Sequence, residues 1–379
     1  MATKELERRC FLKGVGAAGL ALVAGRAEAT SNPGLYCSAN SDRAGQTYLS
    51  LFEGQGSQIA DIPVPERYHG AAVHPSGRAL IGFARRPGIT ATVLDLPSGT
   101  PMRQIDAPSD RHFYGHGAFA ADGSRLWVPE NQFDAEDPGV IGVLDPQDGY
   151  RRIGSLPAHG IGPHEVALCP ATGLLVVANG GIRTHPDLGR VKLNIGSMAP
   201  SLVHLDPQTG RMVHTATLPE RWHHASIRHL AIAPDGTVVL ALQWEGEQDA
   251  DPPLVALLRP GETTPQLPEI PPEIRAAMRL YCGSAALDAS GTIAAVSAPK
   301  GGVTVLIRVS DGQFLGAVPL PDGCGVAALG GSQPGVFLAT SGAGQMVTYT
   351  DHDVTPRTLE GGTSPWWSAR RWDNHLIQI

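Results

Sequence analysis

Short apolar segments that run into glycine-containing turns recur along most of this chain. Six of them read HGAAVHPSG, HGAFAADG, HEVALCPATG, HLAIAPDG, GSAALDASG and CGVAALGGSQPG. Their turns end at Gly77, Gly123, Gly173, Gly236, Gly291 and Gly335, at spacings of 46, 50, 63, 55 and 44 residues. A unit that recurs every few dozen residues predicts a repeat architecture.

Each interval also contains a second turn, as in LPSG (96–99), PQDG (146–149), PQTG (207–210), RPGE (259–262) and VSDG (309–312). The segments between turns are short and rich in Val, Leu, Ile and Ala, which favours β-strands. Four strands and two turns per unit are typical of a β-propeller blade. TIM-barrel and Rossmann folds need long amphipathic helices, whereas the sequence shows one short helical candidate, Pro271 to Arg279.

Six such units lie inside the chain, and the two ends together supply a seventh. Residues 366–379 predict strands around an Asp373-Asn374 turn, and residues 34–40 and 46–54 predict the remaining strands. Pairing the termini closes the ring and removes an open sheet edge. We therefore expect an all-β, seven-bladed propeller of four-stranded blades, as a single domain over residues 30–379.

The first 29 residues carry an export signal. Arg8-Arg9-Cys10-Phe11-Leu12-Lys13 is a twin-arginine motif, an apolar stretch follows from Gly14 to Gly25, and Ala27-Glu28-Ala29 is a cleavage site. The stretch is shorter than the roughly 20 residues that span a bilayer. We expect a signal peptide at 1–29, a periplasmic protein without a membrane span after cleavage, and export in the folded state, which is compatible with prior loading of a metal.

Composition and charge add two restrictions. The formal net charge is −7 and no basic run occurs, which argues against a nucleic-acid partner. Four cysteines remain after cleavage, namely Cys37, Cys169, Cys282 and Cys324. A Cys282–Cys324 disulfide is conceivable in the periplasm; buried free thiols and soft metal ligands are the alternatives.

Polar residues gather where one mouth of the central channel of the propeller should lie. The start of the first strand and the end of the second strand of a blade share that mouth. First-strand starts supply His69, His116, His164, Glu165, Arg228 and His229, second-strand ends supply Arg85, Arg86, Glu130, Asn131, Asn179, Gln243, Glu245 and Lys300, and the loop 180–200 adds His185, Asp187, Arg190 and Lys192.

Strand register divides the six residues at first-strand starts into two sets of three. Counted back from the turns, His116, Glu165 and His229 share one register, and His69, His164 and Arg228 lie one residue earlier. A one-residue slip moves a side chain to the other face of a strand. The side chains of both sets face the channel together only if a strand contains a bulge or if a turn residue is shifted.

Neutral imidazoles with a carboxylate suit iron, copper and zinc. The candidate metal ligands are His69, His116, Glu130, His164, Glu165, His185 and His229. Arginines beside a cation indicate an anionic ligand or ionised carboxylates. The candidate residues for that ligand are Arg85, Arg86, Asn179, Arg190, Arg228 and Gln243. The structural alternative is that the histidines fix loops and the Arg–Glu pairs are solvated salt bridges.

Several segments resemble one family of exported propellers, the domain of unknown function 1513. They are HFYGHGAFAADG, VIGVLD, GIGPHE, ANGGIRTHPDLGRVKLN, MAPSL, SIRHLA, YCGS and SAPKGG, and the similarity runs from about Tyr36 to Gly344. The resemblance implies a seven-bladed, WD40-like propeller in the periplasm. It also implies a genomic association with imelysin-type iron-regulated proteins and dihaem-peroxidase-like proteins, which favours iron or copper. It supplies no catalytic residues.

Three functions follow as hypotheses. The first is binding of iron, copper or an anionic metal complex at the histidine-rich mouth, in metal handling. The second is a metal-dependent enzyme of the lactonase or dehydrogenase type, with Glu165 or Glu130 as general base. The third is a metal-free platform for protein partners, anchored by Trp244, Trp366 and Trp367.

Overall fold

The structure is a computed structural model that describes residues 34–189, 191–330 and 333–379. The predicted signal peptide at 1–29 lies outside these residues. Within them the chain is nearly all β-structure, with two short α-helices, α1 (Pro272–Ala277) and α2 (Pro365–Ser368). Helix α1 coincides with the helical candidate in the sequence. None of the helices described is both long enough and apolar enough to cross a membrane.

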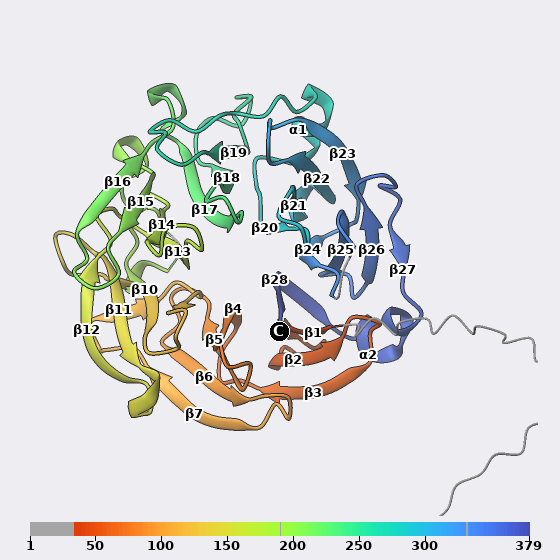
Figure 1. Cartoon of the computed structure of the whole chain (residues 1–379), viewed down its shortest axis with the longest axis horizontal. Coiled ribbons are helices and arrows are strands. Elements are labelled where there is room, and N and C mark those ends of the chain that lie inside the picture. The colour runs from red at the N-terminus through yellow and green to blue at the C-terminus, as the bar shows by residue number, and fades with distance from the viewer. Residues whose placement is uncertain (1–33, 190, 331–332) are drawn as a thin grey trace, which may run out of the picture. The chain divides into compact units, whose positions relative to one another are not determined.

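The strands form seven sheets that surround a central axis as blades (Figure 1), which confirms the seven-bladed propeller. Blade 1 contains β4 (Tyr68–Val73), β5 (Ala79–Ala84), β6 (Thr90–Asp95) and β7 (Pro101–Asp106); blade 2 contains β8 (Arg111–Phe113), β9 (Ala118–Phe119), β10 (Leu126–Gln132), β11 (Gly139–Asp145) and β12 (Arg151–Pro157). Blade 3 contains β13 (Pro163–Leu168), β14 (Leu175–Asn179), β15 (Ser201–Leu205) and β16 (Met212–Ala216).

Blade 4 contains β17 (Ala225–Ile232), β18 (Val238–Trp244) and β19 (Val255–Leu258); blade 5 contains β20 (Ser284–Leu287), β21 (Ile293–Ala298), β22 (Val303–Arg308) and β23 (Phe314–Pro319). Blade 6 contains β24 (Gly323–Ala328), β25 (Val336–Ser341), β26 (Met346–Thr350) and β27 (Arg357–Thr358). In blade 4 a single bridge between Leu257 and Gln266 stands at the place of the fourth strand. In blade 2 the innermost strand is split into β8 and β9, and both parts pair with β10.

The closing blade joins the two ends of the chain, as expected, but by a different division of strands. It contains β1 (Leu35–Ser41), β2 (Thr47–Glu53), β3 (Gln58–Pro63) and β28 (Arg371–Gln378), in the order β28-β1-β2-β3. The predicted Asp373-Asn374 turn is wrong, because both residues lie inside β28, buried at the inner edge of this blade. Asp373 instead pairs with His69, and Asn374 donates to the hydroxyl of Tyr281.

The glycines at the predicted turns explain why the repeat is visible in the sequence. Gly77 and Gly236, for example, have φ values of 68° and 90°. Only glycine adopts such backbone conformations without strain from a Cβ atom. All eleven glycines named above for the two turn series have positive φ, which confirms the predicted turn positions.

Apolar clusters between neighbouring blades hold the ring together. In the closing blade, Phe52, Trp367 and Trp372 pack edge to face, with ring centroids 4.8 Å apart for Phe52–Trp367 and 5.4 Å for Phe52–Trp372. Trp367 is fully buried, and Trp366 packs against the same cluster. Trp367 therefore fills the blade, and Trp366 is partly buried beside it.

The cysteines of the described residues are all free and buried, so the conceivable Cys282–Cys324 disulfide is not formed. Burial raises the pKa of the Cys37 and Cys282 thiols to about 12. A thiol that stays protonated is a poor nucleophile and a poor metal ligand. The cysteines therefore behave as small core residues.

Candidate functional site

Bulges in the innermost strands bring the two predicted register sets to the same face. The pairing of β13 with β14 shifts at His164, and the pairing of β17 with β18 shifts at Arg228. The β4–β5 pairing shifts across the segment that contains His69. A bulge places two residues opposite one and re-aims a side chain. Consecutive residues such as Arg228 and His229 can therefore both reach the channel. The two register sets predicted from the sequence thus meet on one face because of these bulges.

Four histidines from four blades meet at the centre. His69 (β4), His116 (between β8 and β9), His229 (β17) and His375 (β28) each offer a ring nitrogen, and these atoms all lie within 4.8 Å of one another. Each of the four residues is at most 6% exposed. We call this group the four-histidine cluster. His164 stands beside it, with its ring centroid 4.6 Å from that of His229.

Two carboxylates lie behind these rings, the buried Asp373 and the partly buried Glu165. Nδ1 of His69 donates to Oδ1 of Asp373 at 2.8 Å, and Nδ1 of His229 donates to Oε2 of Glu165 at 3.0 Å. The second oxygen of Glu165 lies 3.9 Å from Nδ1 of His116. Carboxylates in this position fix the tautomer of metal-binding histidines and leave Nε2 as the free lone pair.

The ring nitrogens at the centre are poorly satisfied by the protein itself. Nε2 of His116 is buried and has no hydrogen-bond partner among the described residues, and the same holds for Nδ1 of His164. The Nε2 atoms of His69 and His375 are 3.2 Å apart. Buried polar atoms without partners are costly, so a ligand that binds these nitrogens would stabilise the group.

The spacing fits a single metal ion. With metal–nitrogen bonds of about 2.0–2.1 Å, adjacent ligand atoms are about 2.9 Å apart at a right angle and about 3.4 Å apart at a tetrahedral angle. The 3.2 Å between Nε2 of His69 and Nε2 of His375 falls within this interval. Nitrogens on opposite sides of an ion are about 4.2 Å apart, so the 4.8 Å limit of the cluster requires only a small inward shift.

Burial keeps these imidazoles neutral. It lowers the pKa of His116 to about 3, with the neighbouring histidines adding to the effect against the charge of Glu165. It also lowers the pKa of His69, His229 and His375. Neutral imidazoles keep their lone pairs at neutral pH, which metal binding requires.

The two carboxylates respond differently to burial. Burial raises the pKa of Glu165, and the nearby His116 ring and the hydrogen bond from the backbone N–H of Leu230 only partly offset this effect. For Asp373 burial also acts upward, but the hydrogen bond from His69 and the charges of Arg85 and Arg67 hold its pKa below its ordinary value. Asp373 therefore stays ionised behind the cluster.

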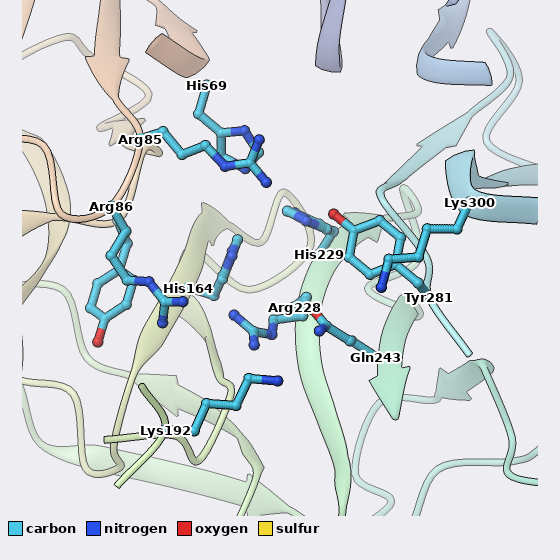
Figure 2. A pocket seen from close by; sticks show the side chains of 11 residues that line it. His69, Arg85, Arg86, His164, Lys192, Arg228, His229, Gln243, Tyr281 and Lys300 are labelled. Carbon is cyan, nitrogen blue, oxygen red and sulfur yellow. The ribbon is translucent and has the colours of Figure 1, made fainter. Parts of the chain in front are cut away.

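A cavity of about 320 Å³ lies against one side of the four-histidine cluster (Figure 2). His69 and His229 line it together with His164, so a small molecule in the cavity would touch the cluster. The other lining residues are Arg85, Arg86, Tyr114, Lys192, Arg228, Gln243, Tyr281 and Lys300. The cavity is thus strongly cationic, and no aspartate or glutamate of the described residues lines it.

Two carboxylates, Glu245 and Asp373, pair with three of these cations. Glu245 pairs with Lys192 and also with Arg228, whose Nη2 lies 3.4 Å from Oε1. Nη1 of Arg85 lies 3.4 Å from Oδ2 of Asp373. Nζ of Lys300 stands 4.8 Å from the centroid of the Tyr281 ring.

Not every predicted site residue reaches the cluster or the cavity. Glu130 is fully buried between Arg152 and Arg111, whose Nη1 lies 3.1 Å from its carboxylate. Asn179 donates to the carbonyl of Ala158 at 3.0 Å.

The predicted residues of the loop 180–200 also lie apart from the four-histidine cluster or outside the described residues. His185 caps a 3-10 turn in the loop and stands 3.2 Å from Asp134. Arg190 falls outside the described residues. The structure thus brings together His69, His116, His164, His229 and Glu165 around the cluster, with Arg85, Arg86, Arg228 and Gln243 in the cavity.

His375 and Asp373 are not among the site residues that the sequence predicts. Both lie on β28, the innermost strand of the closing blade, and therefore occupy the place that first-strand histidines occupy in other blades. A signal for His375 exists, since it precedes the apolar residues of HLIQI as the other histidines precede theirs. The assumed turn at Asp373-Asn374 concealed it.

Comparison with known proteins agrees with this architecture. The model of a family described as "Protein of unknown function (DUF1513)" matches residues 62–379. The chain belongs to this DUF1513 family. No curated protein matches the chain significantly.

Solved structures that resemble this member of the DUF1513 family share its fold at low sequence identity. A chain of Kuenenia stuttgartiensis hydrazine synthase aligns with a TM-score of 0.60 and 14% identity, covering 86% of this chain and 98% of that chain. A structure of U3-55K aligns at 0.53 and 14%, covering 76% and 79%. The RRP9 WD40 repeats align at 0.52 and 14%, covering 82% and 79%. These likenesses concern the propeller alone.

Proposed function

We propose that this protein binds one transition-metal ion, iron or copper, through His69, His116, His229 and His375. The observation that carries the proposal is the meeting of four buried, neutral imidazoles whose ring nitrogens lie within 4.8 Å of one another. Asp373 and Glu165 behind the rings supply the outer hydrogen bonds that such sites use. His164 stands beside the cluster as a further donor.

The choice of metal follows from the ligand type. Neutral imidazole suits iron, copper and zinc alike, and thiolates are absent from the cluster. Of these ions, iron and copper are favoured by the family's implied association with iron-regulated and haem-peroxidase-like proteins. Those proteins are the partners that we propose, and the twin-arginine motif supports the periplasm as the compartment.

The test compares the metal content of exported protein in three forms. The double variant His116→Ala/His375→Ala removes two of the four rings, and His352→Ala removes a ring that is 90% exposed and remote from the cluster. We expect roughly one iron or copper ion per chain in the parent and in the control variant, and loss of the ion in the double variant. A parent protein that is empty and also refuses added iron, copper and zinc would overturn the proposal.

A metal-dependent reaction is the second candidate, and one observation favours it. The cavity is lined by two of the four histidines, so a small molecule inside it would contact the ion directly. Glu165 remains a candidate base, whereas Glu130 is already held by two arginines. Turnover of a lactone or of peroxide that disappears in the double variant would support an enzyme, and a flat screen over these substrates would contradict it.

A further inference from the structure

Lysine is scarce in this chain and concentrated at one place. The sequence has four lysines, Lys4, Lys13, Lys192 and Lys300, and the first two fall within the predicted signal peptide. The other two both line the cavity beside the four-histidine cluster, although they belong to blades 3 and 5. Lysines are ordinarily spread over the exposed surface, so this placement indicates a role for the cavity.

The positive charge of the cavity contrasts with the rest of the chain, whose formal net charge is −7. A single carboxylate, Glu245, forms ion pairs with both Lys192 and Arg228. Lys300 has no carboxylate within ion-pairing distance among the described residues. These three cations therefore exceed their protein carboxylates by two charges, which an anionic ligand would balance.

Arg228 provides an independent sign of a ligand. Its side chain is buried, with the residue only 6% exposed, and its Nε has no hydrogen-bond partner among the described residues. Its ion pair with Glu245 is long, at 3.4 Å. Burying a guanidinium is unfavourable unless its donors are satisfied. A carboxylate in the cavity would accept these N–H groups in the bidentate geometry that arginine favours.

We propose that the cavity binds a small polycarboxylate. Its cations come from blades 1, 3, 4 and 5 and reach the space from different sides (Figure 2), which suits separated carboxylates better than one compact anion. The volume of about 320 Å³ is close to the lower end of the roughly 300–1,000 Å³ of small-molecule sites, so the ligand is small. The inference rests on the proposed function in one respect, namely that the ligand also reaches the metal ion beside His69 and His229.

The two lysines make the proposal directly testable. Both are exposed enough to react with an amine-acetylating reagent, and each falls in a separate peptide that mass spectrometry can follow. We expect succinate and tricarballylate, which chelate metals weakly, to slow acetylation of Lys192 and Lys300 severalfold. Acetate and inorganic phosphate at equal charge concentration should not. Equal protection by phosphate or acetate would overturn the assignment to a polycarboxylate.

Variants then separate this inference from the metal proposal. Lys300→Gln alters an exposed residue, so the fold should persist, and loss of one charged contact should weaken tricarballylate binding about tenfold. Arg308→Gln, on the outer surface of blade 5, is the matched control and should bind as the parent does. Parent protein that holds its metal but shows no polycarboxylate binding would refute the inference alone. Binding of polycarboxylate by protein that never takes up metal would support the anion site and refute the metal proposal.

Discussion

Replacing Asp373 by Asn tests the role of the carboxylates behind the four-histidine cluster. Asp373 is 3% exposed, accepts the Nδ1 proton of His69 at 2.8 Å, and pairs with Arg67 at 2.5 Å and Arg85 at 3.4 Å. Asn keeps the shape but removes the charge that makes His69 a more basic ligand. Loss of such an outer partner typically weakens metal affinity about 10- to 100-fold, or about 1.4–2.8 kcal/mol.

The affinity is measured by competition between the protein and a chromogenic chelator, with Asp353→Asn as the matched control. Asp353 pairs with Arg357 on the surface, where both side chains are exposed, so its substitution should leave the metal affinity unchanged. Thermal unfolding of the metal-free proteins shows whether the fold is intact. A folded Asp373→Asn protein that binds the ion as tightly as the parent would refute the role given to this carboxylate.

Three other predictions follow from the same contacts. Burial lowers the pKa of His116 to about 3, below the ordinary value of 6.5, so the unfolded chain binds more protons than the folded one between these values. The free energy of unfolding of metal-free protein should therefore fall as the pH drops from 6.5 towards 3, and His116→Ala should reduce that slope by up to about 1.4 kcal/mol per pH unit in pH-dependent urea titrations. Glu130→Ala should cost about 3 kcal/mol in chemical denaturation because it removes a fully buried carboxylate that pairs with both Arg111 and Arg152. An unchanged metal content would confirm that Glu130 is structural, and a lost ion without unfolding would contradict it. The buried thiols of Cys37 and Cys282 should resist a thiol-reactive dye in native protein and react after denaturation, and rapid native labelling would contradict the packing described.

The propeller could be predicted from the sequence because its turns require particular residues. Glycine at positions such as Gly77 and Gly236 has a positive φ. The positions of the turns, and the number of residues in each blade, can therefore be predicted from the sequence. The inner position of His69, His116, His164 and His229 followed from their place at the start of first strands. These features depend on local chemistry.

The rest of the site depends on pairing between distant segments. Whether Arg228 and His229 both face the channel is decided by a bulge against β18, which no local pattern reveals. His375 reaches the centre because the last strand of the chain becomes the innermost strand of a blade begun near Leu35. Glu130 lies at the expected strand end, but its side chain meets Arg111 and Arg152 instead of the channel.

The most direct measurement of the central claim is anomalous diffraction from crystals of protein purified after export. We expect one strong anomalous peak at an iron or copper edge, about 2.0–2.1 Å from ring nitrogens of His69, His116, His229 and His375. A peak ligated elsewhere, or an empty cluster in crystals soaked with either metal, would contradict it.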